Sequence, residues 1–248
     1  MSIELDDIEL KLLTGLPIEI IATGDLYSPL VKDIIELGYS KYNELLSCVL
    51  VDKANLVKKV QDDDVSTFTI ILSLCVHDPT YEQKFLKAIE LMFKEKAQFG
   101  HTEDEAFFYF GDITEGRYIT SKNIEYIQAM IRLANQVKHQ DEEEENYNPA
   151  DEQTRKVIEE MLARRKNKPK PKPTINLHSI ISGLACKSNS INHFNVGQLS
   201  LYQLYDSFHR LDVIENYHYT LVGIYSGNVD SKKINFNKIH WTKIIDKN

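Results

Sequence analysis

The sequence predicts a mainly helical α+β protein in two parts, with one or two small β-hairpins. Most apolar residues recur at the three- and four-residue spacing of helices. Aromatic and β-branched runs beside glycine-containing turns occur in two places. A highly charged segment in mid-chain separates a larger N-terminal part from a smaller C-terminal part. With 248 residues, the chain is long enough for both parts to bury a hydrophobic core.

The first elements are a hairpin and two helices. Residues 16–27 have apolar, β-branched residues on both sides of a turn, which predicts a hairpin. Ser28 and Pro29 then predict a helix start, with the hydroxyl as N-cap and proline in the first turn. Gly38 is a typical helix stop, and a second helix is expected over 39–51.

Two further helices are expected before the second hairpin. Residues 66–76 are nearly all apolar or small, so a buried helix and a buried strand both fit, and the length favours a helix. Asp78 and Pro79 predict another capped helix start. The apolar stripe of this helix consists of Phe85, Leu86, Ile89, Met92 and Phe93.

The clearest β element follows. Residues 106–110 and 117–120 flank a loop rich in turn formers at 111–116, which predicts an aromatic hairpin. Ser121 is expected to cap a long helix that continues to Val137.

The charged segment predicts the domain organisation. Residues 141–145 are five consecutive acids, and Lys-Pro alternation over 166–173 predicts an extended polyproline II spacer. One short amphipathic helix is expected between them. The predicted division is an α-rich domain with a hairpin, a charged helix with a linker, and a small helical domain, at 1–140, 141–173 and 174–248.

The C-terminal part is expected to be a compact helical unit. Thr174 predicts a helix start, and a loop is expected over 187–197. Residues 201–211 form the cleanest amphipathic stripe of the chain, and 217–225 and 237–245 are expected to complete the unit.

Composition excludes several classes of protein. A net charge of −8 argues against a general nucleic-acid coat, which needs a basic face. Three cysteines at wide spacings fit a reducing cytoplasm better than a disulfide framework. The N-terminus lacks the pattern of a signal peptide, and no apolar run approaches the roughly 20 residues of a membrane span.

No motif predicts catalysis, a metal site or a cofactor site. Five of the eight histidines follow the linker, but none has the short paired spacing of zinc ligands. Nucleophile elbows and phosphate-binding glycine loops are absent from the sequence. The acidic runs 62–64 and 103–105 fit solvated loops. We therefore expect a non-enzymatic binding protein.

A basic strip precedes the C-terminal part. Its six positive charges are Arg164, Arg165, Lys166, Lys168, Lys170 and Lys172. Such a strip can bind phosphates, but it lacks the aromatic residues that stack on bases. Pairing with the acidic run, or a role as linker, is favoured over nucleic-acid binding.

Aromatic residues make the best case for a protein partner. Five of them concentrate in the second hairpin: Phe107, Phe108, Tyr109, Phe110 and Tyr118. A two-stranded ribbon rarely buries both of its faces, so one face is a candidate interface. The competing interpretation is that these rings fill the local core.

Several segments resemble one poorly characterised protein family. They are Leu16-Pro17-Ile18-Glu19, Tyr42-Asn43-Glu44-Leu45-Leu46-Ser47, the aromatic hairpin, Asn148-Pro149-Ala150, the stretch from Leu199 to Asp206, and Trp241. Together they are similar to a family of tail and baseplate morphogenesis proteins from tailed phages and prophages of low-GC Gram-positive bacteria.

The resemblance implies a role in building the phage tail. Its most concrete form is a tail-assembly chaperone or adaptor in the bacterial host cytoplasm, with a tube, tape-measure or baseplate protein as partner. A permanent component of the tail or baseplate in the virion is the alternative. A DNA-binding regulator that uses the C-terminal helices and the basic strip is a further alternative. The resemblance supplies no catalytic residue.

Overall fold

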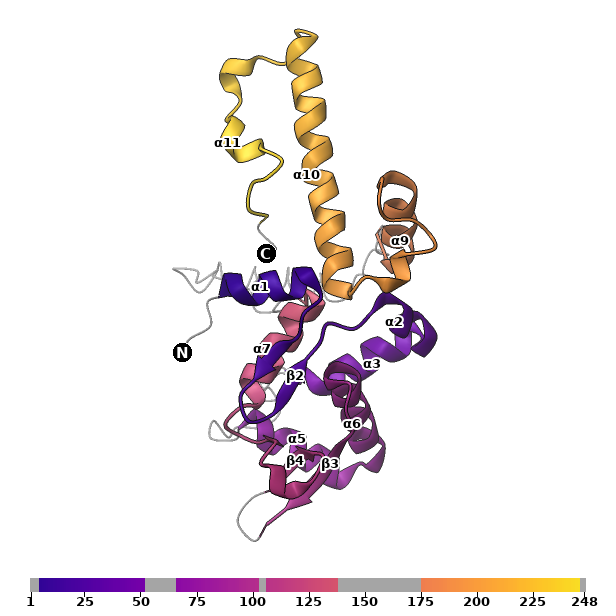
Figure 1. Cartoon of the computed structure of the whole chain (residues 1–248), viewed down its shortest axis with the longest axis vertical. Coiled ribbons are helices and arrows are strands. Elements are labelled where there is room, and N and C mark those ends of the chain that lie inside the picture. Colours follow the sequence, from indigo (N-terminus) through magenta and orange to yellow (C-terminus); the bar gives the residue numbers. More distant parts are fainter. Residues whose placement is uncertain (1–4, 52–65, 103–105, 138–174, 246–248) are drawn as a thin grey trace, which may run out of the picture.

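A computed structural model describes residues 5–51, 66–102, 106–137 and 175–245. Across these residues the fold is mainly helical with two small antiparallel sheets, so the predicted α+β class is confirmed. Figure 1 shows a body of helices around the two sheets, from which one long helix projects.

The chain begins with α1 (Leu5–Thr14), followed by β1 (Ile18–Ile20) and β2 (Gly24–Leu26). The two strands pair antiparallel, which confirms the first predicted hairpin. Their alternating side chains bury Ile18 and Leu26, which are paired across the ladder. The hairpin thus contributes one apolar face to the core.

The helical body consists of α2 (Val31–Leu37), α3 (Tyr39–Val49), α5 (Thr67–His77), α6 (Pro79–Phe93) and α7 (Ile124–Asn135). Ser66 caps α5, and Asp78 caps α6 by accepting a hydrogen bond from the amide of Thr80. Gly38 ends α2 with a φ of 91°, which a residue without a Cβ adopts without strain. The end of α2 at Gly38 and the start of α6 after Asp78 agree with the predicted boundaries.

Three predicted caps are not observed. Leu30 precedes α2 in place of Ser28, because residue 30 is extended and forms an antiparallel bridge with Ser200. Helix α7 begins after Asn123 and not at Ser121. For α9 (Leu177–Lys187), Thr174 lies outside the described residues, and Asn176 caps the helix in a reciprocal capping box with Ser179.

The second sheet has one strand more than the sequence predicts. The predicted hairpin is present as β4 (Ala106–Phe110) and β5 (Tyr118–Ile119). The additional strand, β3 (Ala97–His101), pairs with β4, so the order is β3-β4-β5 and β4 is central.

The C-terminal part contains one long helix where the sequence predicts two. Helix α10 (Leu201–Tyr225) has 25 residues, so it is about 37 Å long. After it come two short turns, η4 (Ser231–Lys233) and α11 (Phe236–Ile239). Within α10 the buried residues are Leu201, Tyr202 and Leu204, all in its first turn.

The base of α10 is joined to the N-terminal half of the chain. The amide of Leu201 donates to the carbonyl of Pro29 at 2.8 Å, and the amide of Val31 donates to the carbonyl of Leu199 at 2.9 Å. Buried residues of α9 and of the first turn of α10 belong to the same hydrophobic cluster as those of the N-terminal helices. The predicted linker and both predicted domain boundaries fall in or beside residues 138–174, outside the described residues.

Candidate partner-binding surface

The β1–β2 turn docks on β5 and fixes its position. The amide of Tyr118 donates to the carbonyl of Ala22 at 2.9 Å, and the hydroxyl of Thr23 donates to the carbonyl of Tyr118 at 3.0 Å. The side-chain amide of Asn123 donates to both Thr23 Oγ1 and the Tyr118 carbonyl. The two hairpins are therefore one hydrogen-bonded unit, although about 90 residues separate them in sequence.

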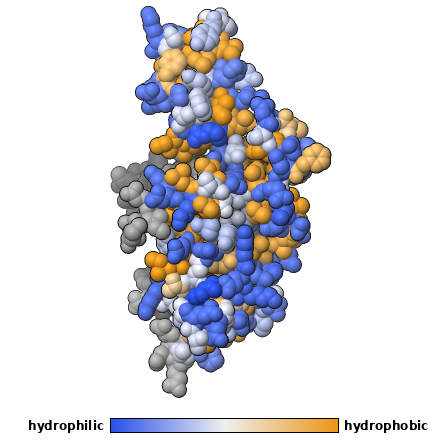
Figure 2. All heavy atoms as spheres, viewed as in Figure 1, coloured by the Kyte–Doolittle hydropathy of each residue, from blue (hydrophilic) through white to orange (hydrophobic). Residues whose placement is uncertain are grey.

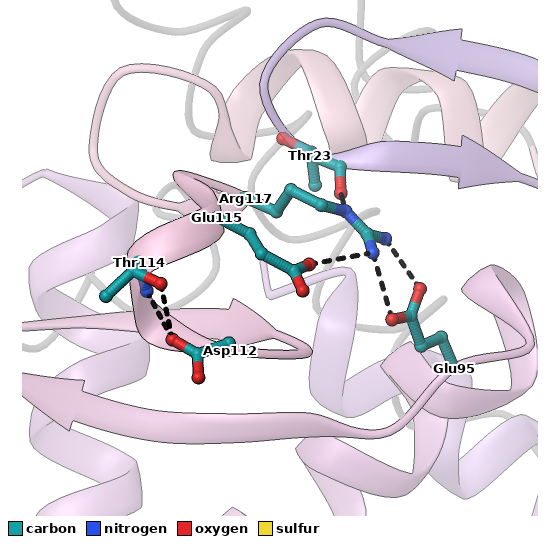
Figure 3. Close-up of polar contacts among 6 residues, drawn as sticks. All are labelled: Thr23, Glu95, Asp112, Thr114, Glu115 and Arg117. Carbon is teal, nitrogen blue, oxygen red and sulfur yellow. Dashed lines mark hydrogen bonds and ion pairs between the residues drawn. The ribbon is translucent and has the colours of Figure 1, made fainter.

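Arg117 clamps this unit to the end of α6. Its Nη1 and Nη2 lie 3.0 and 2.5 Å from the two carboxylate oxygens of Glu95, and its Nε donates to the carbonyl of Thr23 at 3.1 Å (Figure 3). The hydrogen bond to Glu95 raises the pKa of Arg117 above its ordinary value. Because these donors already have partners within the chain, the arginine serves the structure and is not a free anion site.

The acidic side chains in the loop between β4 and β5 also have hydrogen-bond or ion-pair partners within the chain. Asp112 accepts hydrogen bonds from the amide and hydroxyl of Thr114, at 2.8 and 2.7 Å, and these bonds lower the pKa of its carboxyl (Figure 3). The carboxylate of Glu115 lies 3.9 Å from Arg117 Nη1. Both acids thus have local structural roles.

Two of the five predicted contact rings belong to the core. Phe108 and Phe110 are fully buried on the inner face of the sheet. The Phe108 ring lies 4.7 Å from that of Phe85, and the Phe110 ring lies 4.9 Å from that of Phe93. The prediction that these two residues contact a partner is therefore corrected, because α6 and α5 cover the face to which they point.

The other three rings gather on the outer face. Phe107 lies 5.0 Å from Tyr118 and 6.2 Å from Tyr109, in edge-to-face geometry. Both tyrosines are half-buried, and Phe107 beneath them is 8% exposed. The Tyr109 hydroxyl donates to Gln98 on β3 at 3.2 Å, and that of Tyr118 donates to the Ile113 carbonyl.

Gly100 lets these rings lie flat on the sheet. It is paired with Phe107 across the β3–β4 ladder. A Cβ at this position would lie 3.0 Å from the Phe107 ring and 3.1 Å from the Tyr109 ring, which is tighter than ordinary contact. The glycine is thus required by the packing of the outer rings and not by its own backbone conformation.

The sheet that carries the outer rings also has an open strand edge, one strand away from Phe107 and Tyr109. In the described part of the chain, no strand pairs with the edge of β3 that faces away from β4. The backbone groups of such an edge can pair with another strand. We refer to Phe107, Tyr109, Tyr118 and the free edge of β3 together as the aromatic face.

A second candidate surface is the C-terminal arm, defined as residues 205–245. No residue of this described segment is buried. It nevertheless exposes seven large apolar side chains: Ile214, Tyr219, Val222, Tyr225, Phe236, Trp241 and Ile244. Figure 2 shows apolar atoms at the surface of the projecting end of the molecule. The available sequence signal was the run 217–225, which has no charged residue.

The remaining candidates do not form a site in the described residues. Arg164, Arg165, Lys166, Lys168, Lys170 and Lys172 lie outside these residues, as do the acidic runs 62–64 and 103–105. In the described ranges, no group of three histidine, cysteine or acidic side chains is placed to hold a metal ion. Cys48 and Cys75 are buried, and burial raises the pKa of the Cys75 thiol to about 12. No described helix has both the length and the apolar character needed to cross a membrane.

Comparison with known proteins found a matching family for one part of the chain. Residues 166–246 match the YomV second domain, a phage-derived family. The match covers 81 of the 248 residues and includes α9, α10 and the whole C-terminal arm. No curated protein and no solved structure matches the chain. The comparison therefore supports a phage protein and does not indicate a specific function.

Proposed function

We propose that this is a non-enzymatic protein of phage tail morphogenesis, a chaperone or adaptor that binds another tail component. The observation that carries the binding role is the aromatic face, where two half-buried tyrosines share a sheet with a strand edge that no described strand covers. The phage-derived match at 166–246 supports the setting. The partner is a tube, tape-measure or baseplate protein in the host cytoplasm.

The chemistry of the aromatic face favours an extended segment as the client. An added strand would pair with the backbone of β3, and its alternate side chains would lie beside Gln98 and Gly100, with Tyr109 on the next strand, β4. Tyrosine contributes large contact area with few rotatable bonds, so it loses little entropy on binding. Such a site would cover an aggregation-prone strand of a tail component until that component polymerises.

The test is affinity capture of the tagged protein from phage-producing cells, read by mass spectrometry. Tail proteins should be captured by the wild type, and Tyr109→Ser should reduce their recovery by about tenfold or more, as expected for a hot-spot tyrosine. Tyr126→Ser is the matched control, because Tyr126 is an exposed tyrosine on α7, outside the sheet. Recovery of DNA, of host proteins alone, or of tail proteins equally by both variants would contradict the proposal.

Purified phage particles distinguish a chaperone from a permanent tail component. A chaperone should be missing from particles that contain its client. Presence at a stoichiometry comparable to that of tail proteins would instead identify a structural component of the tail or baseplate.

A further inference from the structure

Helix α10 carries an exposed apolar stripe beyond the body of the protein. The apolar residues Ile214, Val222 and Tyr225, with the exposed imidazole of His218 between the first two, follow one another at intervals of four, four and three residues, so they lie along one side of the helix. Val222 is 48% exposed and Tyr225 is 84% exposed. The opposite side bears Asp212, Asn216 and Thr220, so the projecting helix is amphipathic.

The rest of the arm covers a different side of α10. Arg210 donates to the carbonyls of Trp241 and Lys243 at 2.8 and 2.9 Å, and the rings of Tyr217 and His240 lie 5.4 Å apart. The chain after α10 therefore runs back beside the helix (Figure 1). It leaves Val222 and Tyr225 exposed.

The far end of the arm and helix α1 at its base carry opposite charge. The turn η4 at the far end of α10 contains Lys232 and Lys233 and is preceded by Asp230, a net charge of +1. At the base of α10, α1 exposes the carboxylates of Asp6 and Asp7. Gln203 of α10 donates to the carbonyl of Leu13 at 2.9 Å, so α1 is fixed at this base. Helix α1 also exposes three leucines: Leu5, Leu10 and Leu13.

We propose that the occupant of the stripe is a second copy of this chain, in an antiparallel two-fold dimer formed by the arms. In this arrangement the apolar stripe of one α10 covers that of the other. Lys232 and Lys233 at the far end of each arm then reach the acidic, leucine-bearing α1 of its partner. A two-fold interface makes each of these contacts twice, because the same surface is used by both copies.

The dimensions of the arm are adequate for a stable dimer. The 20 residues from Asp206 to Tyr225 extend about 30 Å. With the returning segment beside it, the arm is about 20 Å wide, since each element has a diameter of about 10 Å. The footprint is therefore about 600 Å², and the contact with the partner's α1 adds to it. Together they approach the roughly 800 Å² per partner of a standard interface.

Charge distribution selects the antiparallel arrangement. Residues 205–245 hold five basic and four acidic residues, a net charge of +1, whereas the other described residues hold eleven basic and fifteen acidic residues, a net charge of −4. Antiparallel arms place the acidic bodies at opposite ends, separated by more than the Debye length of about 8 Å at physiological salt. Parallel arms would place the two acidic bodies side by side.

Analytical ultracentrifugation of the full-length protein tests whether the apolar stripe of α10 forms a dimer interface. The wild type should sediment as a dimer at micromolar concentration, and Val222→Lys should raise the dimer dissociation constant by about 100-fold, because each interface buries the charge twice. Asn216→Lys, on the polar side of the same helix, should leave it unchanged. A monomeric wild type, or a dimer equally stable in both variants, would overturn the proposal. Circular dichroism checks that α10 remains helical.

A charge exchange tests the identity of the occupant. Lys232→Glu with Lys233→Glu should weaken the dimer, since the arm end then repels the partner's α1. Adding Asp6→Lys and Asp7→Lys to the same chain should restore the dimer, because both contacts then regain opposite charges. Failure of this rescue would show that the arm end does not meet α1 of a second copy, and would refute the antiparallel dimer.

Discussion

Ser28 shows how one side chain joins three distant segments. Its hydroxyl donates to the carbonyl of Ala134 at 2.8 Å and accepts from the amide of Tyr202 at 3.1 Å. The Ser-Pro pair predicts an N-cap because such a cap needs only local sequence, whereas the observed partners lie 106 and 174 residues away. Contacts over such separations leave no signal in one sequence, so the role of Ser28 could not be predicted.

Replacing Ser28 tests this connection. Ser28→Ala should lower the free energy of unfolding by about 1–3 kcal/mol, because a buried carbonyl and a buried amide both lose their partner. Chemical denaturation followed by circular dichroism measures the change. Ser47→Ala is the control: the hydroxyl of Ser47 donates to a carbonyl at an exposed site, so its loss should cost at most about 0.5 kcal/mol. Equal stability of the two variants would contradict the assigned role.

At the scale of elements, the sequence could predict features that depend only on neighbouring residues, such as the start of a capped helix. The start of α6 followed from Asp78-Pro79, since cap residues act within one turn. Strand β3 was missed because Ala97-Gln98-Phe99-Gly100-His101 has one strong strand former and a glycine. Its conformation depends on pairing with β4, which is a tertiary contact.

For helix α10, the sequence predicted a break that the structure does not have. Asp212, Glu215 and Asn216 interrupt the apolar pattern, which suggested two helices. The helix continues because two of these residues are exposed and Glu215 forms an ion pair with Lys187 of α9 at 3.0 Å. A polar residue ends an apolar stripe but does not end a helix, for which proline or a C-cap is needed.

The two faces of the three-stranded sheet should respond differently to mutation. Phe108→Ala should lower the free energy of unfolding by about 3–5 kcal/mol, because it leaves a cavity among buried rings. Tyr109→Ala, on the half-buried outer face, should cost less than half as much. Thermal and chemical denaturation of both variants provide the comparison. A larger loss for Tyr109 than for Phe108 would mean that the inner and outer faces are misassigned.

At the scale of the whole molecule, the two candidate surfaces lie far apart. Figure 1 shows the three-stranded sheet at one end of the protein and the projecting arm at the other. An antiparallel dimer formed by the arms would therefore leave both aromatic faces accessible at its two outer ends. Two such sites in one assembly would bind a repetitive tail component with increased avidity.

The sequence predicted the helical class and the aromatic hairpin, but not which rings remain accessible. All five rings lie in one hairpin, and their division into Phe108 and Phe110 inside and Phe107, Tyr109 and Tyr118 outside depends on α5 and α6 covering one face. The expectation of a phage protein came from the resemblance and is supported for residues 166–246.

Site-specific photocrosslinking at Tyr109 tests the central claim most directly. A photoreactive phenylalanine derivative replaces Tyr109 in phage-producing cells, and one at Tyr126 serves as the control. The account predicts a crosslink to one tail protein from position 109 and none from position 126. Absence of a crosslink from position 109, or the same crosslinked proteins from both positions, would contradict the aromatic face as the site where this protein binds its partner.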